Sequence, residues 1–456
     1  MTDGSPPAAP KEGSLDAPIR HALAWHDPDF IDPAKIDAEL RRVFDICHGC
    51  RRCFNLCDSF PRLFDLVDES PTGEVDGVKS EDFPSVVEAC TLCDMCFMTK
   101  CPYVPPHEFD LDFPHLMLRA RVADAARGKK HVVQHQLGEM DRNGRLAGPV
   151  AGLVNWASSV TNAPVRKLME GTIGVDARAE LPKFHGRTFV MAAKAAPPAV
   201  DVHAPARGRK AVIYATCSVN FNRPEVGEAA LKVLAKNGVE TKVLYPACCG
   251  MPFLEQGDLA RVEKQARKVT AALKPYVDEG YDVLTLTASC GLMFKFEWPL
   301  VLPGDEAVKA LSSATRDIDE YIVDIARKEG LAPGLSPIRE GVSVHLACHA
   351  RAQNKGPKAA EMLRLIPDTP VTVVERCSGH GGTFGVMKET HEIALKVGKP
   401  AMRAALKAGH PHLVSDCPLA AKHLVQGMAG LAGEGESVPA QGRHPIEILA
   451  MAYGLV

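Results

Sequence analysis

The sequence predicts an α/β protein in which a mainly helical, cysteine-rich N-terminal module precedes two small, duplicated parallel-sheet domains. Three observations lead to this fold class. Eight cysteines are grouped in two short runs between residues 47 and 101. After residue 209, the chain twice repeats a pattern of strand, helix, strand, helix and strand. Each predicted strand of this repeat ends at a cysteine, as expected for duplicated domains with related sites.

Composition shifts divide the chain into five parts. The first residues are rich in proline, alanine and glycine, and three prolines, Pro197, Pro198 and Pro205, mark a break before the repeat. We therefore expect a flexible N-terminus over 1–30, a cluster-binding module with a helical extension over 31–185, a linker over 186–209, a first cysteine-rich domain over 210–335 and a second one over 336–456.

The two N-terminal runs have the ligand spacing of a two-cluster ferredoxin. The first reads C-x2-C-x2-C-x3-C from Cys47 to Cys57, and the second reads C-x2-C-x2-C-x4-C from Cys90 to Cys101. In this pattern three cysteines of one run and the fourth of the other bind one cubane. The runs therefore predict a ferredoxin-like module with two [4Fe–4S] clusters. The predicted ligands are Cys47, Cys50, Cys53 and Cys101 for cluster 1, and Cys57, Cys90, Cys93 and Cys96 for cluster 2.

Structural zinc is the alternative for these runs, because zinc also takes four thiolates. Zinc patterns usually consist of two separated pairs, whereas both runs here are triplets with an outlying fourth cysteine. The spacing therefore favours clusters. Arg51, Arg52 and Lys100 lie beside predicted ligands, where they either stabilise a reduced cluster or form ordinary solvated surface.

The repeat places further cysteines at the carboxyl ends of predicted strands, where open α/β sheets build their sites. The first copy offers four thiols and the second offers three, so that all fifteen cysteines belong to a group. The first group is Cys217, Cys248, Cys249 and Cys290, and the second is Cys348, Cys377 and Cys417.

These two groups leave several interpretations open. Four thiolates are enough for a further iron–sulfur cluster or for zinc. Three thiolates form an incomplete site, which His349, His380 or the hydroxyl of Ser378 could complete. Free cysteines at strand ends can also simply pack in the core. Cys417 starts a predicted helix, whose positive end is expected to lower its thiol pKa.

The arrangement of these cysteines resembles the duplicated cysteine-rich (CCG) domain found in the B subunit of heterodisulfide reductase. With a ferredoxin-like module in front, the chain is similar to the iron–sulfur (C) subunit of anaerobic glycerol-3-phosphate dehydrogenase and to the glycolate oxidase iron–sulfur subunit. The full motif of that family has five cysteines in each copy. This chain departs from it at Met293, Ser378 and Ala420, where the motif has cysteines.

The resemblance implies an electron-transfer protein. The clusters would relay electrons from a dehydrogenase partner, a flavoprotein or another redox protein, to a cysteine-lined C-terminal site and an acceptor such as a quinone or a disulfide. Two alternatives remain open: a stand-alone thiol/disulfide reductase, and a non-redox zinc-binding or sensing module. Whether the chain itself turns over a substrate also stays open, and no single residue is assigned to catalysis.

Composition bounds the partners and the compartment. The net charge of −3 gives no broad attraction to nucleic acid, and no apolar run approaches the roughly 20 residues that span a bilayer. Fifteen cysteines at short spacing favour metal in a reducing compartment over disulfides. We therefore expect a cytoplasmic protein that contacts the inner face of a membrane only through a partner.

Overall fold

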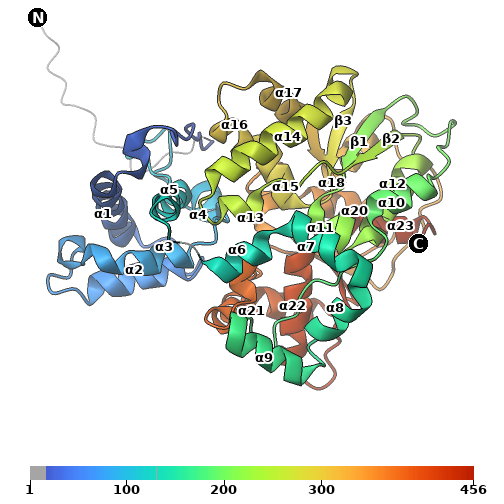
Figure 1. Cartoon of the computed structure of the whole chain (residues 1–456). Helices are drawn as coiled ribbons and strands as arrows, with labels where there is room; N and C mark the ends of the chain where they lie inside the picture. The colour runs from blue at the N-terminus through green and yellow to red at the C-terminus, as the bar shows by residue number, and fades with distance from the viewer. Residues whose placement is uncertain (1–16, 130) are drawn as a thin grey trace, which may run out of the picture.

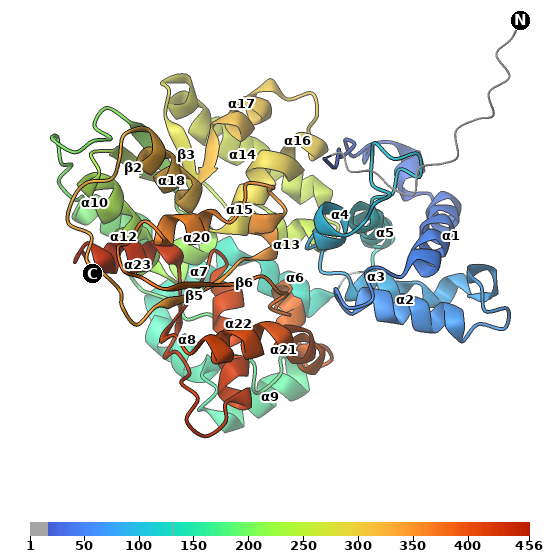
Figure 2. The ribbon, with the colours of Figure 1, turned by 180° about the vertical axis from the view of Figure 1, so that it is seen from behind.

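The computed structural model describes residues 17–129 and 131–456. Helices α1 to α5 form a module beside two α/β domains, and helices α6 to α9 run across the α/β part (Figure 1). The view from behind shows strands β5 and β6 of the second domain together with α20 and α23 (Figure 2). The predicted fold class, with duplicated small parallel-sheet domains, is confirmed.

The N-terminal module is built from helices and short turns. Pro33 and Asp32 begin its first helix, because the Asp32 carboxylate accepts a hydrogen bond from the Lys35 amide and proline suits the first turn. Ile36, Leu40, Val43 and Phe44 form the buried face of this helix. The helices are α1 (Pro33–Cys50), α2 (Ser59–Asp68), α3 (Pro84–Ala89), α4 (Met95–Thr99) and α5 (Phe113–Ala126), with 3-10 turns at Pro28–Ile31, Val75–Gly77 and Ser80–Asp82.

Within the expected flexible N-terminus over 1–30, residues 17–30 make defined contacts with the rest of the protein. Residues 1–16 lie outside the described part of the chain. From residue 17 onward, the Ile19 amide donates to the Pro105 carbonyl at 3.0 Å and the Leu23 amide donates to the Leu300 carbonyl at 2.9 Å. Leu23 is buried, and Arg20 forms three ion pairs that are described below. The segment therefore joins the N-terminal module to the first α/β domain.

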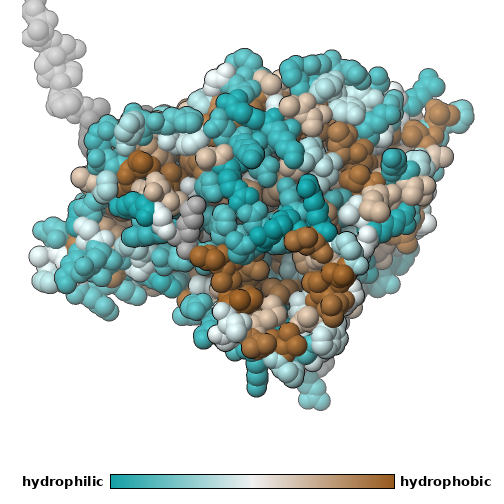
Figure 3. All heavy atoms as spheres, viewed as in Figure 1, coloured by the Kyte–Doolittle hydropathy of each residue, from teal (hydrophilic) through white to brown (hydrophobic). Residues whose placement is uncertain are grey.

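The helical extension ends in a surface that is rich in apolar side chains. Its helices are α6 (Val132–Gly138), α7 (Met140–Ala147), α8 (Ala151–Ser158) and α9 (Ala163–Ile173), with a 3-10 turn at Gly148–Val150. Figure 3 shows hydrophobic side chains gathered over α8 and α9. We call this surface the apolar face; its exposed members are Leu146, Val150, Leu153, Trp156, Val160, Leu168 and Ile173.

The expected linker over 186–209 contributes a helix of its own. Helix α10 (Phe189–Ala195) begins at Thr188, whose hydroxyl accepts from the Met191 amide at 3.2 Å. Phe189 is fully buried and packs against Gly227, where a Cβ would overlap its ring. This part of the chain therefore packs onto the first α/β domain, and the remaining residues to 209 connect it to the first strand.

Two four-stranded parallel sheets form the rest of the protein, and both have the same topology. The first copy has the strand order β2-β1-β3-β4 and the second has β6-β5-β7-β8. The fourth strand of each sheet was not part of the predicted repeat. The strands are β1 (Lys210–Tyr214), β2 (Glu240–Leu244), β3 (Asp282–Thr285), β4 (Thr315–Asp317), β5 (Val342–His345), β6 (Val371–Val374), β7 (His412–Ser415) and β8 (Gly442–Arg443).

Helices cover both sheets, as parallel strands require. In the first copy they are α11 (Cys217–Phe221), α12 (Pro224–Lys236), α13 (Met251–Leu254), α14 (Leu259–Asp278), α15 (Ala288–Leu292), a π-helical turn at Met293–Glu297, α16 (Trp298–Val301), α17 (Glu306–Ala314) and α18 (Ile318–Lys328). In the second copy they are α19 (Cys348–Arg351), α20 (Lys358–Leu363), a 3-10 turn at Gly382–Gly385, α21 (His391–Ala408), α22 (Pro418–Leu431) and α23 (Pro445–Ala452).

The two copies contact each other directly. Ala288 of α15 packs with Ala347 and Ala350 in a small apolar cluster. The buried ammonium of Lys355, from the second copy, pairs with Asp317 and with Asp319 at 3.0 Å. A buried ion pair is costly to break from one side, so this pair fixes how the copies meet.

Candidate functional site

The fifteen cysteines lie on loops and in or beside the ends of helices. All of them are in the described part of the chain, where none forms a disulfide. Cys47 and Cys50 lie in the last turns of α1, and Cys96 lies in α4. The cysteines of the two sheets follow the carboxyl ends of β1, β2 and β3 in the first copy and of β5, β6 and β7 in the second.

The four residues predicted to bind cluster 1 lie together. Cys47, Cys50, Cys53 and Cys101 line one small hollow. Burial raises the pKa of Cys47 well above its usual range, and the thiols of Cys101, Cys53 and Cys50 raise it further. The pKa of Cys53 is raised to about 12 and that of Cys101 to about 11, mainly by burial. A bound cation is what would hold several such thiols as thiolates.

Non-glycine residues in the left-handed region let the chain turn at these cysteines. Arg51 follows Cys50 with φ of 52°, and Leu92 and Asp94 flank Cys93 with φ of 48° and 62°. Such backbone conformations are costly for residues with a Cβ and gather at functional sites. Each of these turns changes the chain direction between two consecutive cysteines of a triplet.

The four residues predicted to bind cluster 2 also lie together and adjoin the first group. The pKa of Cys57 is raised well above its usual range by burial and by the thiols of Cys93 and Cys90. Burial is also the largest cause that raises the pKa of Cys96. The next largest causes are the thiols of Cys93, Cys90, Cys53 and Cys57. Cys96 therefore lies within electrostatic reach of both groups, which makes the two groups neighbours.

Two arginines hold the loop of this second group. Arg20 donates to Asp94 at 2.8 Å, to Asp112 at 2.8 Å and to Glu297 at 3.3 Å, and its guanidinium lies 4.4 Å from the centroid of the Phe97 ring. Arg121 of α5 donates to the backbone carbonyls of Cys90 and Glu255. The sequence motif did not reveal either arginine, because both lie far from the cysteines along the chain.

The four cysteines of the first copy form a compact buried group. The sulfur atoms of Cys217 and Cys248 are 4.0 Å apart, and those of Cys249 and Cys290 are 3.4 Å apart. Hydrogen bonds from the Cys217 and Cys249 thiols lower the pKa of Cys248 well below its usual range. Hydrogen bonding with Cys248 raises the pKa of Cys217 and of Cys249 well above the usual range, so a thiolate at Cys248 is favoured over one at either of these two.

Side chains outside the motif orient this group. Asp141 of α7 accepts a hydrogen bond from the Cys248 amide at 3.1 Å and another from the Tyr245 hydroxyl. The indole of Trp298 donates to the Cys249 carbonyl at 3.0 Å, and the Tyr214 hydroxyl donates to the Ala247 carbonyl at 2.6 Å. The buried Met293 stands where the resembled motif has a fifth cysteine.

Cysteines of the second copy lie near the N-terminal loop that carries Cys93. Burial raises the pKa of Cys348, and its next largest influences are the thiols of Cys93, Cys377 and Cys417. The thiol of Cys377 is likewise the largest electrostatic influence on the pKa of Cys93 after burial. The imidazole of His349 contacts the carbonyl of Leu92 at 3.3 Å. The second group thus adjoins the predicted cluster 2 ligands.

The candidates for a fourth ligand in the second group differ in availability. Both ring nitrogens of His349 are engaged, with the Leu92 carbonyl and with the Ser289 hydroxyl at 2.8 Å. The Ser378 hydroxyl accepts from the His380 amide at 3.5 Å.

Amides at the start of α22 lower the pKa of Cys417 as expected, but burial outweighs them and the pKa rises to about 11. The start of the helix therefore acts in the expected direction, but the net pKa of Cys417 is raised.

The donor sets fit metal chemistry, although the sites do not have the geometry of formed ones. Among residues 17–129 and 131–456, no group of three or more Cys, His, Asp or Glu side chains has the arrangement of a formed metal site. Four thiols converge in each of three groups, a donor set that suits iron–sulfur clusters or zinc. Small movements of these side chains would accompany binding.

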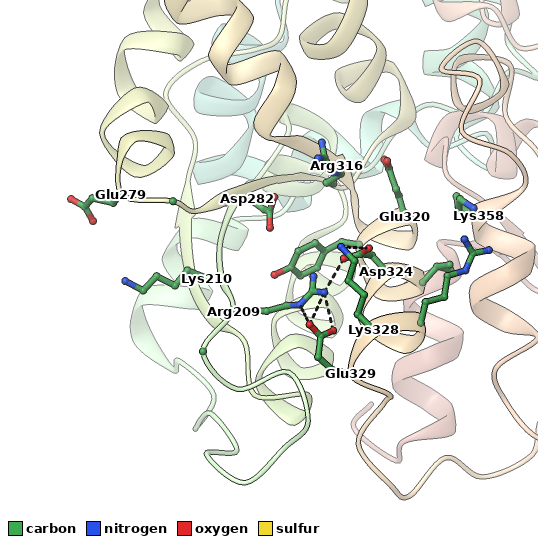
Figure 4. A pocket seen from close by; sticks show the side chains of 15 residues that line it. Arg209, Lys210, Glu279, Asp282, Arg316, Glu320, Asp324, Lys328, Glu329 and Lys358 are labelled. Carbon is green, nitrogen blue, oxygen red and sulfur yellow. Dashed lines mark hydrogen bonds and ion pairs between the residues drawn. The ribbon is translucent and has the colours of Figure 1, made fainter.

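A separate, charged pocket lies at the opposite edge of the first sheet. It has a volume of about 630 Å³ and is lined by Lys210, Asp282 and Arg316 at the amino ends of strands (Figure 4). Arg209 pairs there with Asp324 and Glu329, each at 2.8 Å, so that the charges largely compensate each other. The pocket is remote from the cysteines, which follow the carboxyl ends of the same strands.

Comparisons with known proteins agree with the cysteine pattern. The family model of the cysteine-rich domain CCG matches residues 211–295 and again 342–421. Lactate utilization protein A of Bacillus pumilus is 30% identical over 188 residues, which cover 39% of this chain and 75% of that protein.

Two further relatives are named as components of larger enzymes. The C subunit of anaerobic glycerol-3-phosphate dehydrogenase from Escherichia coli K12 is 29% identical over 322 residues, 69% of this chain and 76% of that protein. The B subunit of fumarate reductase (CoM/CoB) from Methanothermobacter marburgensis is 28% identical over 252 residues, 54% of this chain and 47% of that protein. None of the described helices is both long and apolar enough to cross a membrane.

Proposed function

Because the chain belongs to the family of proteins with two CCG cysteine-rich domains that includes lactate utilization protein A and the C subunit of anaerobic glycerol-3-phosphate dehydrogenase, we propose that it is an iron–sulfur electron-transfer subunit. It relays electrons from a dehydrogenase partner, a flavoprotein or another redox protein, through two [4Fe–4S] clusters. The electrons then pass to the cysteine-rich domains and to an acceptor.

The continuity of the thiol groups is the observation that carries this proposal. Cys96 interacts with Cys53 of the cluster 1 group, and Cys93 interacts with Cys377 and Cys348 of the second copy. An electron that enters the N-terminal module therefore has neighbouring redox sites on a path into the α/β part. Metal sites with a purely structural role do not have to lie next to one another.

The residues that would hold the clusters are those of the two N-terminal groups. Cluster 1 takes Cys47, Cys50, Cys53 and Cys101, and cluster 2 takes Cys57, Cys90, Cys93 and Cys96. When bound, such clusters supply one-electron transfer. The chain's own part is to fix the ligands and to set the local charge.

Cations beside the first group favour the reduced state. Arg52 and Lys100 lie near the Cys53 thiol and oppose the rise in its pKa. Arg51 instead pairs with Asp68, so its charge is compensated. We propose that Arg52 and Lys100 stabilise the negative charge added to cluster 1 on reduction.

The apolar face supports association with a partner subunit. Within residues 146–173, Lys167 is the one exposed charged side chain, and Trp156 is 61% exposed. Large exposed apolar surfaces mark interaction sites, and permanent interfaces are the more apolar kind. We propose that this face is covered by a partner protein with an apolar surface of its own. Any membrane contact of the complex then goes through that partner.

Elemental analysis with electron paramagnetic resonance tests the relay. On protein purified without oxygen, two cubanes account for about eight irons per chain. We expect at least this iron content, equal acid-labile sulfide and the spectrum of two interacting clusters after reduction. A Cys93→Ser variant should lose or alter one of the two signals. Little iron together with stoichiometric zinc would sink the electron-transfer proposal.

The same experiment decides what the cysteine-rich domains hold. About twelve irons, with a third signal that a Cys248→Ser variant lacks, would indicate a further cluster in the first copy. About eight irons, with a spectrum that is unchanged in Cys248→Ser, would mean that the four thiols of the first copy bind zinc or remain protonated. A Cys377→Ser variant tests in the same way whether the second group binds a cluster.

Zinc in the first copy is favoured by one observation. Tetrahedral zinc with thiolate ligands spaces its sulfur atoms about 3.8 Å apart, since Zn–S bonds are about 2.3 Å long. The sulfur separations of 4.0 and 3.4 Å lie on either side of this value. A cubane binds its thiolates to four separate irons and spaces them more widely.

Stand-alone thiol/disulfide reduction is the remaining alternative. The first copy holds four cysteines rather than the five of the resembled motif, and the second holds three. Turnover of a disulfide by the purified chain, with a chemical reductant and no second protein, would favour this activity over relay.

A further inference from the structure

Three histidines of the second copy form a buried group that the electron-transfer proposal does not use. His380 precedes the turn at Gly382–Gly385, His391 is the first residue of α21, and His423 lies within α22. They are 9%, 0% and 5% exposed. The ring centroids of His380 and His423 are 6.0 Å apart, and those of His391 and His423 are 6.2 Å apart.

All three imidazoles share an unusual feature: the buried Nε2 atom has no hydrogen-bond partner in the part of the chain that the structure describes. Buried polar atoms are normally paired, because an unpaired one loses its hydration without compensation. One such atom is common enough, but three on neighbouring rings at one place call for a ligand that all three can share.

The second nitrogen of His391 shows how that ring is oriented. Its Nδ1 contacts the Gly385 carbonyl at 2.7 Å. A carbonyl oxygen can only accept a hydrogen bond, so Nδ1 is the N–H donor and the lone pair lies on Nε2. Histidine ligands of metals almost always make this kind of bond with their other nitrogen. The Asp176 carboxylate is buried and lies near His391, but it pairs with Arg178 at 2.7 Å, so its charge is compensated.

We propose that His380, His391 and His423 bind one divalent transition-metal ion, with zinc as the reference metal, through their Nε2 atoms. Two imidazoles on one zinc ion have ring centroids roughly 5 to 6 Å apart, given Zn–N bonds of about 2 Å. The separation of 6.0 Å between His380 and His423 lies at the upper limit of this range, and that of 6.2 Å between His391 and His423 lies just above it. The rings are not yet in the arrangement of a formed site, so binding draws them together.

The protonation of these rings suits a metal. Burial lowers the pKa of His380 to about 3 and that of His423 to about 4. Both imidazoles are therefore neutral at pH 7, as a ligand must be. The ion would join the loop after Cys377 to helices α21 and α22. It would thus stabilise the segment that presents Cys377 to the N-terminal module.

The test compares single variants of the three histidines with a matched control. We measure zinc per chain in the full-length protein after equilibration with Zn²⁺ and removal of the excess. His380→Gln, His391→Gln and His423→Gln should each lose one equivalent, with affinity reduced by more than the roughly 10–100-fold that loss of a supporting bond costs. His345→Gln should lose none, because both nitrogens of this buried ring already contact Ser415 and Arg376, each at 3.0 Å.

A second measurement needs no variant and so does not depend on folding of the mutants. X-ray absorption at the zinc edge should show a zinc population with nitrogen ligands near about 2.0 Å, distinct from thiolate zinc with sulfur near about 2.3 Å. Equal zinc content in the wild type and all three variants, or a shell of sulfur alone, would overturn the proposal. Iron and sulfide, measured on the same samples, report separately on the clusters.

Discussion

At the scale of single residues, Arg20 shows how the N-terminal module and the α/β part are held together. Its guanidinium is 11% exposed and pairs with one carboxylate from each of three elements: the cluster 2 loop, the start of α5 and the π-helical turn of the first copy. His115 pairs with the same Glu297 at 3.2 Å. Removal of Arg20 would leave the buried carboxylates of Asp94 and Glu297 and the partly buried one of Asp112 without this partner.

We therefore expect Arg20→Ala to destabilise the protein strongly. Breaking a buried ion pair from one side costs about 3–5 kcal/mol, because the partner charges stay buried without compensation. Urea unfolding measures this loss, and the cluster 2 resonance should weaken with it. Arg42→Ala is the control: Arg42 is 42% exposed and its ion pair with Glu39 lies at the surface, so its loss should cost less than about 1 kcal/mol. Equal effects would contradict the role of Arg20.

The buried thiols predict how the metal-free protein responds to pH. The folded-state pKa values of Cys53, Cys101 and Cys417 are raised to about 12, 11 and 11, above the ordinary value of 9.0. Between about pH 9 and 11 the folded state thus keeps protons that the unfolded state has lost. The free energy of unfolding should fall as pH rises through this window, by up to about 1.4 kcal/mol per pH unit for each thiol.

The check is a series of unfolding curves from about pH 8 to 11 on metal-free protein. Protein with its metals bound serves as the control, because bound thiolates no longer take up protons on folding. A metal-free protein whose stability is flat across this range would show that these thiols are not buried together.

At the scale of elements, the loop after β6 depends on a close approach of two backbones. Gly379 has φ of +78°, and a Cβ at this position would overlap the carbonyl oxygen of Ala394 in α21. Its amide also donates to the Cys377 sulfur at 3.3 Å. The loop can therefore reach the N-terminal module only if residue 379 has no side chain.

Gly379→Ala should be more destabilising than the backbone angle alone explains. Gly280→Ala is the matched control, since Gly280 has φ of +81° and no atom lies within 4 Å of the place a Cβ would take. We expect about 1 kcal/mol for Gly280→Ala and at least about 3 kcal/mol for Gly379→Ala, where overlap is added. Thermal unfolding compares the two. Similar losses would mean that the loop moves away from α21 without cost.

The elements also show what a sequence can and cannot reveal. The parallel sheets could be predicted from short apolar runs that end at a cysteine, such as the one with Val212 and Ile213. Such a run and the cysteine after it are both visible in a few consecutive residues. Strands β4 and β8 were missed, since Thr315–Asp317 and Gly442–Arg443 are too short to show a period. Arg20 and Asp141 were missed because only the fold brings them to the cysteines.

The same limit applies to the arrangement of the groups. Spacing alone grouped the eight N-terminal cysteines, which the structure brings into two neighbouring sets. It did not show where the cysteines of the two copies lie relative to these sets. In the structure Cys348 and Cys377 adjoin Cys93, and alanines such as Ala288 and Ala347 fill the contact between the copies. Contacts between domains have no local signal in a single sequence.

At the scale of the whole molecule, the proposed function depends on two surfaces that lie on different parts of the chain. Electrons would enter near cluster 1, where Arg52 and Phe54 are exposed, and would leave through the α/β part. The apolar face lies on helices α8 and α9 of the extension, which an antiparallel bridge between Val175 and Met387 ties to the second copy. A partner that binds there would therefore contact the part of the protein that receives the electrons.

If a partner covers the apolar face, as proposed, the chain alone should behave differently from the complex. We expect the purified protein to self-associate at micromolar concentration, because water drives exposed apolar side chains together. Leu153→Asp should reduce this association, since a charge at the centre of the face must be desolvated in any contact. Sedimentation velocity over a range of concentrations measures the change.

Val202→Asp is the control for that experiment, because Val202 is 61% exposed, close to the 65% of Leu153, but lies outside the apolar face. Tryptophan fluorescence adds a direct probe, since Trp156 is 61% exposed whereas Trp298 is fully buried. Quenching by iodide should be weaker in the associated state of the wild type and should not change with concentration in Leu153→Asp. If Val202→Asp reduced association as much as Leu153→Asp, general surface charge rather than this face would control assembly, and the partner would have to bind elsewhere.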